Sequence, residues 1–410
     1  MNIIFITLSN INSIKERGIY ADLMRKFRDE GHGVYIVSPC ERRTGQNTHL
    51  VEIDGVKILK VRTLNIQKTN VVEKGIGTLL IEGQYKWAIK KYLRDVKFDL
   101  ITYSTPPITF TNVVKYLKKR NQQAISYLQL KDIFPQNAVD IGMFKENSLF
   151  NKYFRKKEIS LYKTSDYIGC MSPANVKFIL DHNDYIDSKR VEVAPNSIEL
   201  REGISESRDG AESKSIREKY GLPTDKPIFI YGGNLGKPQG IDFLIKCMNE
   251  VVTRSDCFFL IIGNGTEYHK LEDWYNTQLS SYGSQLSVKL MQRLPKEDYD
   301  LLVRSCDVGL IFLDCRFTIP NYPSRLLSYL ENRMPVICAT DVNTDIGRIA
   351  EENGYGYWCE STNTVGFTLL VNKILSKPER IKEMGERGYE FLKKNYTVQN
   401  TYDAIMKHFK

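Results

Sequence analysis

The chain has little of what marks membrane, disulfide-bonded or metal-binding proteins. Its apolar runs stay well short of the roughly 18 residues that a membrane-spanning helix needs. The apolar start at residues 1–6 lacks the basic region and cleavage site of a signal peptide, so we expect a cytoplasmic protein. The eight cysteines are scattered, without a CxxC pair or a histidine at ligand spacing, which predicts reduced core residues. The five histidines offer no histidine base and no Ser-His-Asp arrangement.

Composition and charge fit a folded globular protein of two domains. Of the 410 residues, 42% are hydrophobic and 26% are charged, which excludes extensive disorder. The length exceeds what one hydrophobic core usually serves. The net charge of +9 suits nucleic acid, an anionic bilayer or a phosphorylated substrate. Because the basic residues are dispersed and form no stripe with base-stacking aromatic residues, nucleic acid is the least supported partner.

Short apolar runs alternate with longer amphipathic segments along the chain, which is the pattern of parallel sheets covered by helices on both faces. The expected strands lie at 2–8, 34–38, 56–62, 100–104, 124–130, 167–171 and 191–194, and then at 228–231, 257–262, 288–291, 307–313 and 336–339. We therefore predict an α/β protein of two tandem Rossmann-like doubly wound domains with an inter-domain cleft. Ligands should lie in that cleft, at the carboxyl ends of the strands.

The polar segment 202–214, which has almost no apolar residues, separates the two strand series. We expect an N-terminal Rossmann-like domain at 1–196, a linker at 197–214, and a C-terminal Rossmann-like domain at 215–392. The remaining residues, 393–410, should form a C-terminal helix that can pack back on the first domain.

The segment Phe317–Thr340 combines a turn-rich loop, a short helix and a buried strand. Pro323 ends any preceding strand and Ser324 can cap the helix, so the first free amides and Arg325 would face an anion such as a sugar-nucleotide diphosphate. An ordinary capped helix that leads into a parallel strand is the structural alternative.

The run Pro-Ser-Arg-Leu-Leu at 323–327, followed by Met-Pro-Val-Ile at 334–337, resembles the donor segment of glycosyltransferase family 4, which has the GT-B fold. The likeness is to the capsule and O-antigen enzymes, of the L-fucosamine-transferase kind, and it weakly covers the whole chain. It implies transfer of a sugar, such as an N-acetylated deoxyhexosamine, from a UDP-sugar to a polyprenyl-diphosphate-linked saccharide. A hydrolysing UDP-sugar 2-epimerase and a catalytically silent nucleotide-binding subunit are the alternatives.

A glycine-rich loop follows the first strand of the second half, where phosphates bind in such sheets. The resemblance assigns Gly233, Asn234, Gly236 and Lys237 to the donor diphosphate. The family's usual basic residue after the glycines is Asn234 here, and its Lys-Gly pair is Gln239-Gly240. A glycine turn that serves packing alone is the structural alternative.

Two further loops are assigned to the nucleotide by the same resemblance. Gly263 and Gly265 match the Gly-x-Gly turn below the nucleotide. Leu294 is expected to meet the uracil edge, with Arg293 nearby as a phosphate contact. A solvated surface arginine is the alternative for Arg293.

The chain departs from the family at its paired glutamates, whose positions fall on Pro320 and Ser328. Glu331 lies three residues beyond Ser328 on the same helical face and is expected to accept bonds from ribose hydroxyls, unless it is a solvated helix-end residue. Thr318 and Asn321 are the polar candidates for contact with the sugar. This departure leaves open whether the reaction retains or inverts configuration.

In the first half, Asp132 follows a buried strand within the run Lys131-Asp132-Ile133-Phe134-Pro135 and is the catalytic candidate. It resembles the acceptor-side acid of the O-antigen enzymes, where it could remove the acceptor hydroxyl proton. A turn-capping Asp is the alternative. Ser104-Thr105-Pro106-Pro107 and Ser172-Pro173 are expected to start helices with a serine cap and a proline.

No DxD pair follows a strand end, so we expect metal-independent transfer without a cofactor. The segments 86–94 and 115–120 set lysines beside aromatic residues. They should pack on their own sheet as amphipathic helices with solvated lysines, and the alternative is that they lie on anionic lipid. A lipid-linked acceptor would suit that alternative, with peripheral association at the inner face of the plasma membrane.

Overall fold

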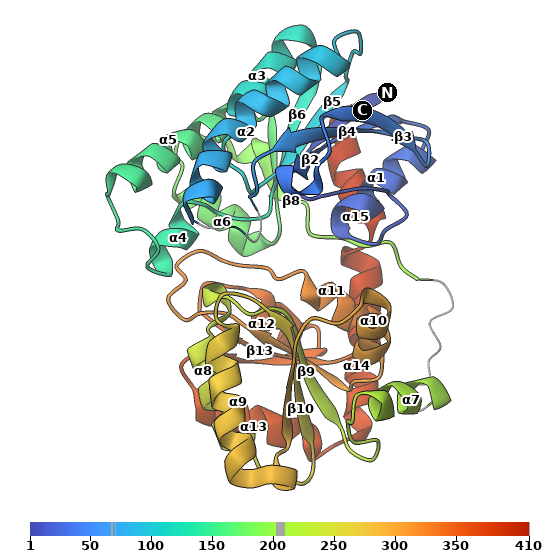
Figure 1. Cartoon of the computed structure of the whole chain (residues 1–410), viewed down its shortest axis with the longest axis vertical. Helices are drawn as coiled ribbons and strands as arrows, with labels where there is room; N and C mark the ends of the chain where they lie inside the picture. The colour runs from blue at the N-terminus through green and yellow to red at the C-terminus, as the bar shows by residue number, and fades with distance from the viewer. Residues whose placement is uncertain (67–68, 70, 202–209, 410) are drawn as a thin grey trace. The chain divides into compact units, whose positions relative to one another are not determined.

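The computed structural model describes residues 1–66, 69, 71–201 and 210–409. The chain divides into two compact units (Figure 1). The first comprises Met1–Glu199 together with Tyr396–Lys410, and the second comprises Leu200–Asn395. Each unit is an α/β domain with a parallel-sheet core, as the alternation of apolar runs and amphipathic segments predicts.

The first unit has an eight-stranded sheet in the order β3-β4-β2-β1-β5-β6-β7-β8. Among the described residues, β3 is its one antiparallel strand. The central strands are apolar on both faces because helices cover both sides. The strands are β1 (Asn2–Ile6), β2 (Gly33–Glu41), β3 (His49–Ile53), β4 (Val56–Thr63), β5 (Leu100–Ser104), β6 (Ile125–Leu130), β7 (Tyr167–Cys170) and β8 (Val191–Val193).

Helices cover both faces of this sheet, with α2, α3 and α5 on one side and α1 and α15 on the other (Figure 1). The chain returns to this unit at its end, where α15 packs on α1 and Ile405 enters the core. The helices are α1 (Ile19–Asp29), α2 (Val71–Tyr92), α3 (Thr111–Arg120), α4 (Gln136–Asp140), α5 (Leu149–Thr164), α6 (Pro173–Asp181) and α15 (Val398–Met406), with the 3₁₀ turns η1 (Arg42–Thr44), η2 (Ser188–Arg190) and η5 (Lys407–Phe409).

The second unit has a six-stranded parallel sheet in the order β11-β10-β9-β12-β13-β14, the doubly wound arrangement of mononucleotide-binding folds. The order reverses between β9 and β12, which lie side by side. The strands are β9 (Ile228–Asn234), β10 (Phe258–Asn264), β11 (Val288–Met291), β12 (Val308–Phe312), β13 (Val336–Thr340) and β14 (Gly356–Glu360).

In the second unit, α8 packs with α9 and α13 on one face of the sheet, and α11 packs with α14 on the other (Figure 1). The core includes Phe229, Phe259 and Phe312 from three neighbouring strands. The helices are α7 (Ala211–Lys219), α8 (Ile241–Val251), α9 (Tyr268–Tyr282), α10 (Lys296–Arg304), α11 (Arg325–Glu331), α12 (Ile346–Glu352), α13 (Thr364–Leu375) and α14 (Glu379–Asn395), with the 3₁₀ turns η3 (Lys237–Gln239) and η4 (Gly283–Gln285).

Two strands were absent from the sequence expectations. Both β3 and β14 are edge strands that are only partly buried, so neither needs a continuous apolar run. The expected linker also differs, because residues 211–214 form the start of α7. Its residues 202–209 lie outside the described residues, as does Lys410 at the end of the expected C-terminal helix.

Of the two expected serine caps in the first unit, one is confirmed and one is wrong. Ser172 Oγ accepts a hydrogen bond from the backbone N–H of Asn175, and Pro173 is the first residue of α6. Ser104 instead ends β5, and its hydroxyl donates to Thr7 Oγ1 at 3.2 Å. The next helix begins only at Thr111, because the residues after Ser104 form a loop.

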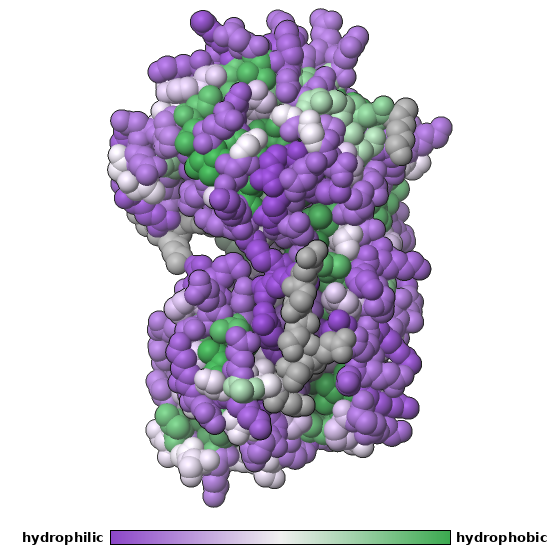
Figure 2. Space-filling model, turned by 90° about the vertical axis from the view of Figure 1, so that its right-hand side faces the viewer, coloured by the Kyte–Doolittle hydropathy of each residue, from purple (hydrophilic) through white to green (hydrophobic). Residues whose placement is uncertain are grey.

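The face of the molecule drawn in Figure 2 is mostly hydrophilic, and its hydrophobic residues gather in separate patches. Across residues 1–66, 69, 71–201 and 210–409, no helix is both long and apolar enough to span a bilayer.

Candidate functional site

The strand order of the second unit reverses between β9 and β12, and open α/β sheets bind ligands at the carboxyl ends of strands beside such a point. At this edge β9 ends in Gly232, Gly233 and Asn234. The chain after β12 crosses the same edge before it enters α11 at Arg325. The glycine loop and Arg325, which the sequence singled out separately, therefore meet.

Arg325 occupies the space beneath the glycine loop. Its guanidinium carbon lies 4.3 Å from the centre of the Tyr231 ring. Gly233 has φ of 130°, and a Cβ added there would lie 3.4 Å from Arg325 Nη2, so the loop backbone covers the guanidinium closely. The Nη1 atom is enclosed and has no hydrogen-bond partner among the described residues.

No carboxylate among the described residues forms an ion pair with Arg325, so its charge is left uncompensated at the edge where open α/β sheets generally bind ligands. Enclosed charges are normally paired, and a guanidinium matches the geometry of phosphate oxygens. The arrangement favours an anion at this position. Arg325 is the member of the predicted site that the geometry supports most directly.

Three tyrosines that the sequence analysis did not single out surround this guanidinium. Besides Tyr231, Tyr329 accepts a hydrogen bond from the backbone N–H of Gly232 at 3.1 Å and donates to the carbonyl of Ile230 at 3.2 Å. Burial raises the pKa of Tyr299 to about 12, so that its phenol stays neutral near pH 7. The tyrosines position the loop and the arginine without neutralising the positive charge. The sequence feature that could have identified Tyr231 as a site residue is its place on the expected strand, directly before the glycines.

The loop after β9 is closed by the two residues at which the chain departs from the family pattern. The Asn234 side-chain amide donates to Gln239 Oε1 at 2.8 Å, and the backbone N–H of Gly236 donates to the same oxygen at 3.2 Å. Lys237 is exposed. Asn234 and Gln239 therefore act as a pair that shapes the loop, and Lys237 is the cation of the loop itself.

The Gly263–Gly265 turn fits tightly against the glycine loop. A Cβ on Gly263 would lie 1.8 Å from the carbonyl oxygen of Gly233, which only a glycine avoids. The backbone N–H of Leu235 donates to the carbonyl of Asn264 at 3.0 Å. These contacts explain Gly263 by packing between the two loops, and leave Gly265 beside the loop as part of the same turn.

The other residues expected at the nucleotide lie in the loop after β11 and at or within α11. Arg293 is exposed and Leu294 half-buried in the loop after β11, which lies two strands from β9 in the sheet. Ser324 does not cap α11 with its side chain, contrary to expectation, because its own backbone is already helical. Ser328 is half-buried on α11, and its carbonyl accepts from Asn332 Nδ2 at 2.8 Å.

Glu331 is the last residue of α11, so about 9 Å of helix separates it from Arg325. It is buried, and it accepts a hydrogen bond from the backbone N–H of Arg201 at 3.1 Å. The Arg201 guanidinium Nε lies 3.8 Å from its second oxygen. Glu331 thus contacts Arg201 at the C-terminal end of α11, and its expected contact with ribose hydroxyls stays a prediction.

Asn321 lies in the loop between β12 and α11, and the turn after β13 holds that loop. The backbone N–H of Asn321 donates to Thr344 Oγ1 at 3.0 Å, and this hydroxyl donates to Asp341 Oδ2 at 2.9 Å. Asn343 Nδ2 donates to the carbonyl of Phe317 at 2.7 Å. Burial raises the pKa of Asp341 to about 6. This clamp of Asp341, Asn343 and Thr344 had no signal in the sequence.

In the first unit, Asp132 follows β6 at the carboxyl edge of its own sheet. Its carboxylate accepts from Asn137 Nδ2 at 2.6 Å, and its backbone N–H donates to Thr105 Oγ1 at 3.1 Å. Burial raises its pKa to about 6. Tyr20 is an electrostatic neighbour, whose own pKa burial raises to about 12. The carboxyl group is thus positioned and weakly acidic, as a general base near neutral pH requires.

Lys131 precedes Asp132, and burial lowers its pKa to about 7. Its ammonium group donates to the carbonyl of Ala194 at 3.2 Å.

Among the described residues, no three His, Cys, Asp or Glu side chains gather as a metal-binding group.

Three comparisons bear on this arrangement. Residues 212–391 match the family described as "Glycosyl transferases group 1". "Probable glycosyltransferase WbjE" of Pseudomonas aeruginosa is 24% identical over 341 residues, covering 80% of this chain and 78% of that protein. Sucrose-phosphate synthase from Thermosynechococcus elongatus has the same fold, with a TM-score of 0.73 and 14% identity over 100% of this chain and 98% of that one.

A further solved structure, Anabaena Alr3699/HepE in complex with UDP-glucose, superposes with a TM-score of 0.69 and 11% identity over 100% of this chain and 99% of that one. These likenesses agree on two α/β domains of the GT-B kind. The segment 212–391, which makes up most of the second unit, is thus similar to the glycosyltransferase group 1 family, and the full-length likeness is to a probable glycosyltransferase.

Proposed function

We propose that the protein transfers a sugar from a UDP-sugar to a lipid-linked saccharide. The observation that carries this proposal is Arg325, whose enclosed Nη1 has no hydrogen-bond partner among the described residues, at the edge where β9 and β12 end. The diphosphate of the donor supplies the missing anion. A solved neighbour that shares the fold holds UDP-glucose, which supports this class of donor.

The donor chemistry follows from the charge at this edge. As the bond between the sugar and the diphosphate breaks, negative charge grows on the leaving oxygen, and a fixed guanidinium stabilises it. Lys237 and the glycine-loop amides add positive potential. With these groups present, the proposed transfer needs no divalent metal and no cofactor.

The acceptor chemistry is assigned to Asp132. With a pKa of about 6, its carboxyl group is mostly ionised at pH 7 and can take the proton of the attacking hydroxyl. Asn137 holds one carboxylate oxygen at 2.6 Å, which fixes the direction of the other. The Asp-Ile-Phe-Pro run supports an acceptor of the capsule or O-antigen type, with an N-acetylated deoxyhexosamine as one donor sugar to test. A polyprenyl-diphosphate anchor would bring the enzyme to the inner face of the plasma membrane.

Release of UDP from candidate UDP-sugars, measured with and without a polyprenyl-diphosphate-linked saccharide, tests the proposal. Acceptor-dependent release of UDP with a new glycoside in the lipid fraction is the expected result. Acceptor-independent release with an epimerised sugar would identify a UDP-sugar 2-epimerase. Binding of UDP without any turnover across the donor panel would identify a silent nucleotide-binding subunit.

A further inference from the structure

The helix α2 of the first unit exposes an apolar stripe. Ile76, Leu79, Leu80 and Trp87 are 48%, 57%, 50% and 53% exposed. Their spacing puts them on one side of the helix. The opposite side buries Ile81, Tyr85, Ala88 and Ile89 against the unit, so α2 packs on its own sheet as the sequence predicted. The exposed stripe is additional to that packing.

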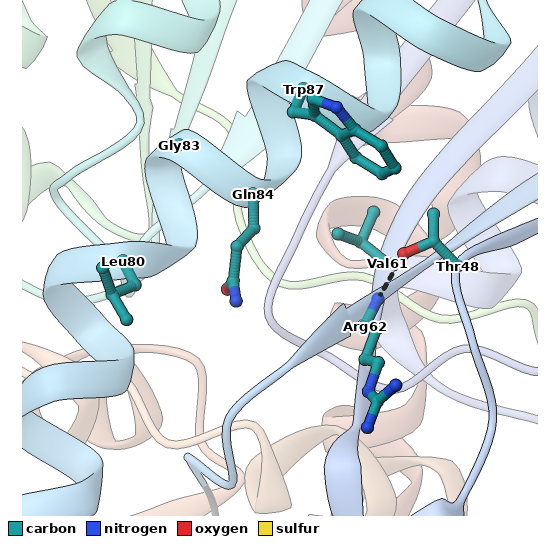
Figure 3. Close-up of a pocket in the computed structure, with 7 residues that line it drawn as sticks. All are labelled: Thr48, Val61, Arg62, Leu80, Gly83, Gln84 and Trp87. Carbon is teal, nitrogen blue, oxygen red and sulfur yellow. Dashed lines mark hydrogen bonds between the residues drawn. The ribbon is translucent and has the colours of Figure 1, made fainter.

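A hollow of about 420 Å³ extends the stripe toward strand β4. Figure 3 shows Leu80, Gly83, Gln84 and Trp87 on α2 facing Val61, Arg62 and Thr48 across this space. The wall is mainly apolar, and Arg62 is exposed at its rim. Exposure of this apolar stripe and of the hollow beside it to water is unfavourable in free energy, because of the hydrophobic effect.

The same side of α2 becomes cationic toward its C-terminus. Lys86, Lys90 and Lys91 are exposed, and none forms an ion pair with a carboxylate among the described residues. The Lys91 ammonium lies 5.0 Å from the centre of the Trp87 ring. Within residues 75–91, all of which the structure describes, the exposed positions include no Asp or Glu. Glu82 is half-buried and accepts hydrogen bonds from Asn112.

We propose that α2 docks, parallel to the surface, on an anionic lipid bilayer. Leucine and isoleucine enter the acyl boundary, tryptophan sits at the interface, and the lysines meet anionic headgroups, which is the chemistry of interfacial helices. The charge favours a bilayer over a second copy of this chain, because a symmetric pair of α2 faces would present these lysines with no exposed carboxylate of residues 75–91 to pair with them. This exposed side of α2 extends the proposed function, since a lipid-linked acceptor lies in such a membrane. The test of membrane binding uses neither the sugar donor nor the acceptor.

Flotation of the purified chain with vesicles tests the proposal. We expect binding to vesicles of phosphatidylcholine mixed with phosphatidylglycerol, weak binding to phosphatidylcholine alone, and release in high salt. The double variant Leu79→Ser/Leu80→Ser should lower the partition coefficient about tenfold or more. The triple variant Lys86→Gln/Lys90→Gln/Lys91→Gln should lower it about a hundredfold on anionic vesicles only.

The matched control is Val365→Ser/Leu369→Ser, an equally exposed apolar pair on α13 of the second unit. It should float like the wild type, and unchanged circular dichroism and UDP affinity would show that every variant is folded. The proposal is overturned if the wild type does not float with anionic vesicles, or if the α2 variants float as well as the control. It is also overturned if sedimentation shows a dimer that the α2 variants dissociate. A chain that floats but binds no UDP would refute the proposed function and leave this surface standing.

Discussion

The Arg325 guanidinium lies over the face of the Tyr231 ring, with 4.3 Å between the guanidinium carbon and the ring centre. The ring faces a cation whose Nη1 has no hydrogen-bond partner in the described part of the chain. A cation held by an aromatic face keeps its position and its full charge. This contact prepares the carboxyl edge of β9 for an anion before the ligand arrives.

Replacing Arg325 by alanine should weaken UDP binding by about 1.5 to 3 kcal/mol, because a charge-assisted hydrogen bond to phosphate is lost. Isothermal titration calorimetry measures the change. Arg348→Ala, which removes an exposed arginine paired with Glu352 on α12, is the matched control and should bind UDP normally. Normal UDP affinity in a folded Arg325→Ala protein would remove this residue from the site.

The hydrogen bond between Asn234 and Gln239 should couple the two residues in donor binding. Asn234→Ala and Gln239→Ala each open the loop, so the double variant should lose little more UDP affinity than the worse single variant. The expected coupling free energy is about 0.5 to 1.5 kcal/mol. Calorimetry on the four proteins gives this value directly. Additive losses would show that the two side chains contact the ligand independently.

Thr344→Val should separate binding of the sugar from binding of UDP. The valine keeps the shape of the threonine but removes the hydroxyl between Asn321 and Asp341, so the loop after β12 loses its anchor. We expect a loss of about 1 to 3 kcal/mol in the free energy of unfolding, the cost of leaving buried polar groups unpaired. KM for the UDP-sugar should rise while the Kd for UDP stays near the wild-type value.

Thr368→Val, which removes a helix-surface hydroxyl on α13, is the control for Thr344→Val and should change neither quantity. Equal losses of UDP and UDP-sugar affinity in Thr344→Val would mean that the clamp supports the whole nucleotide site. Unchanged stability and KM would mean that the clamp does not position the loop.

Transfer should proceed after treatment with EDTA, because Arg325, Lys237 and the loop amides face the leaving diphosphate in the proposed mechanism. Turnover measured with chelator, and again after addition of Mg²⁺ or Mn²⁺, should agree within error. Loss of activity in EDTA with recovery on Mg²⁺ would show that a metal ion shares the diphosphate site.

The sheets and most helices could be predicted from the sequence because buried parallel strands read as short apolar runs, such as Val336–Thr340. The edge strand β14 could not, since Gly356–Glu360 is only partly buried and carries no such run. The C-terminal helix was expected to pack back on the first domain, and the structure shows that α15 packs against α1 of that unit.

The candidate site was predictable where a residue's place along a strand decides its function. Gly233 lies at the carboxyl end of β9, and Arg325 is the first residue of α11, which begins at the same edge of the sheet. The clamp on Asn321 could not be foreseen, because it depends on a turn after a different strand. The role of Glu331 stays a prediction, because the structure shows only that it ends α11 and accepts a hydrogen bond from the backbone N–H of Arg201.

Asp132→Asn should lower turnover by about 10² to 10⁴-fold while UDP affinity stays near the wild-type value, because the amide keeps the shape but cannot take a proton. In the wild type, turnover should rise with pH through about 6, as the carboxyl group ionises. Kinetics from pH 5 to 8 should show that limb in the wild type and not in the variant. A stable variant with normal turnover would exclude Asp132 as the base.

Stability against pH supplies an independent test of the same carboxyl group. Burial raises its folded-state pKa to about 6 from an ordinary value near 4, so the native state binds more protons than the unfolded state between these two pH values. The wild type should therefore lose stability as pH rises through that window, by up to about 3 kcal/mol before solvent screening. Asp132→Asn has no such charge to bury and keeps an acceptor for Asn137, so its Tm relative to the wild type should climb from pH 4 to pH 7. A Tm below the wild type at every pH, with binding and turnover lost in proportion, would instead identify Asp132 as a turn-capping residue.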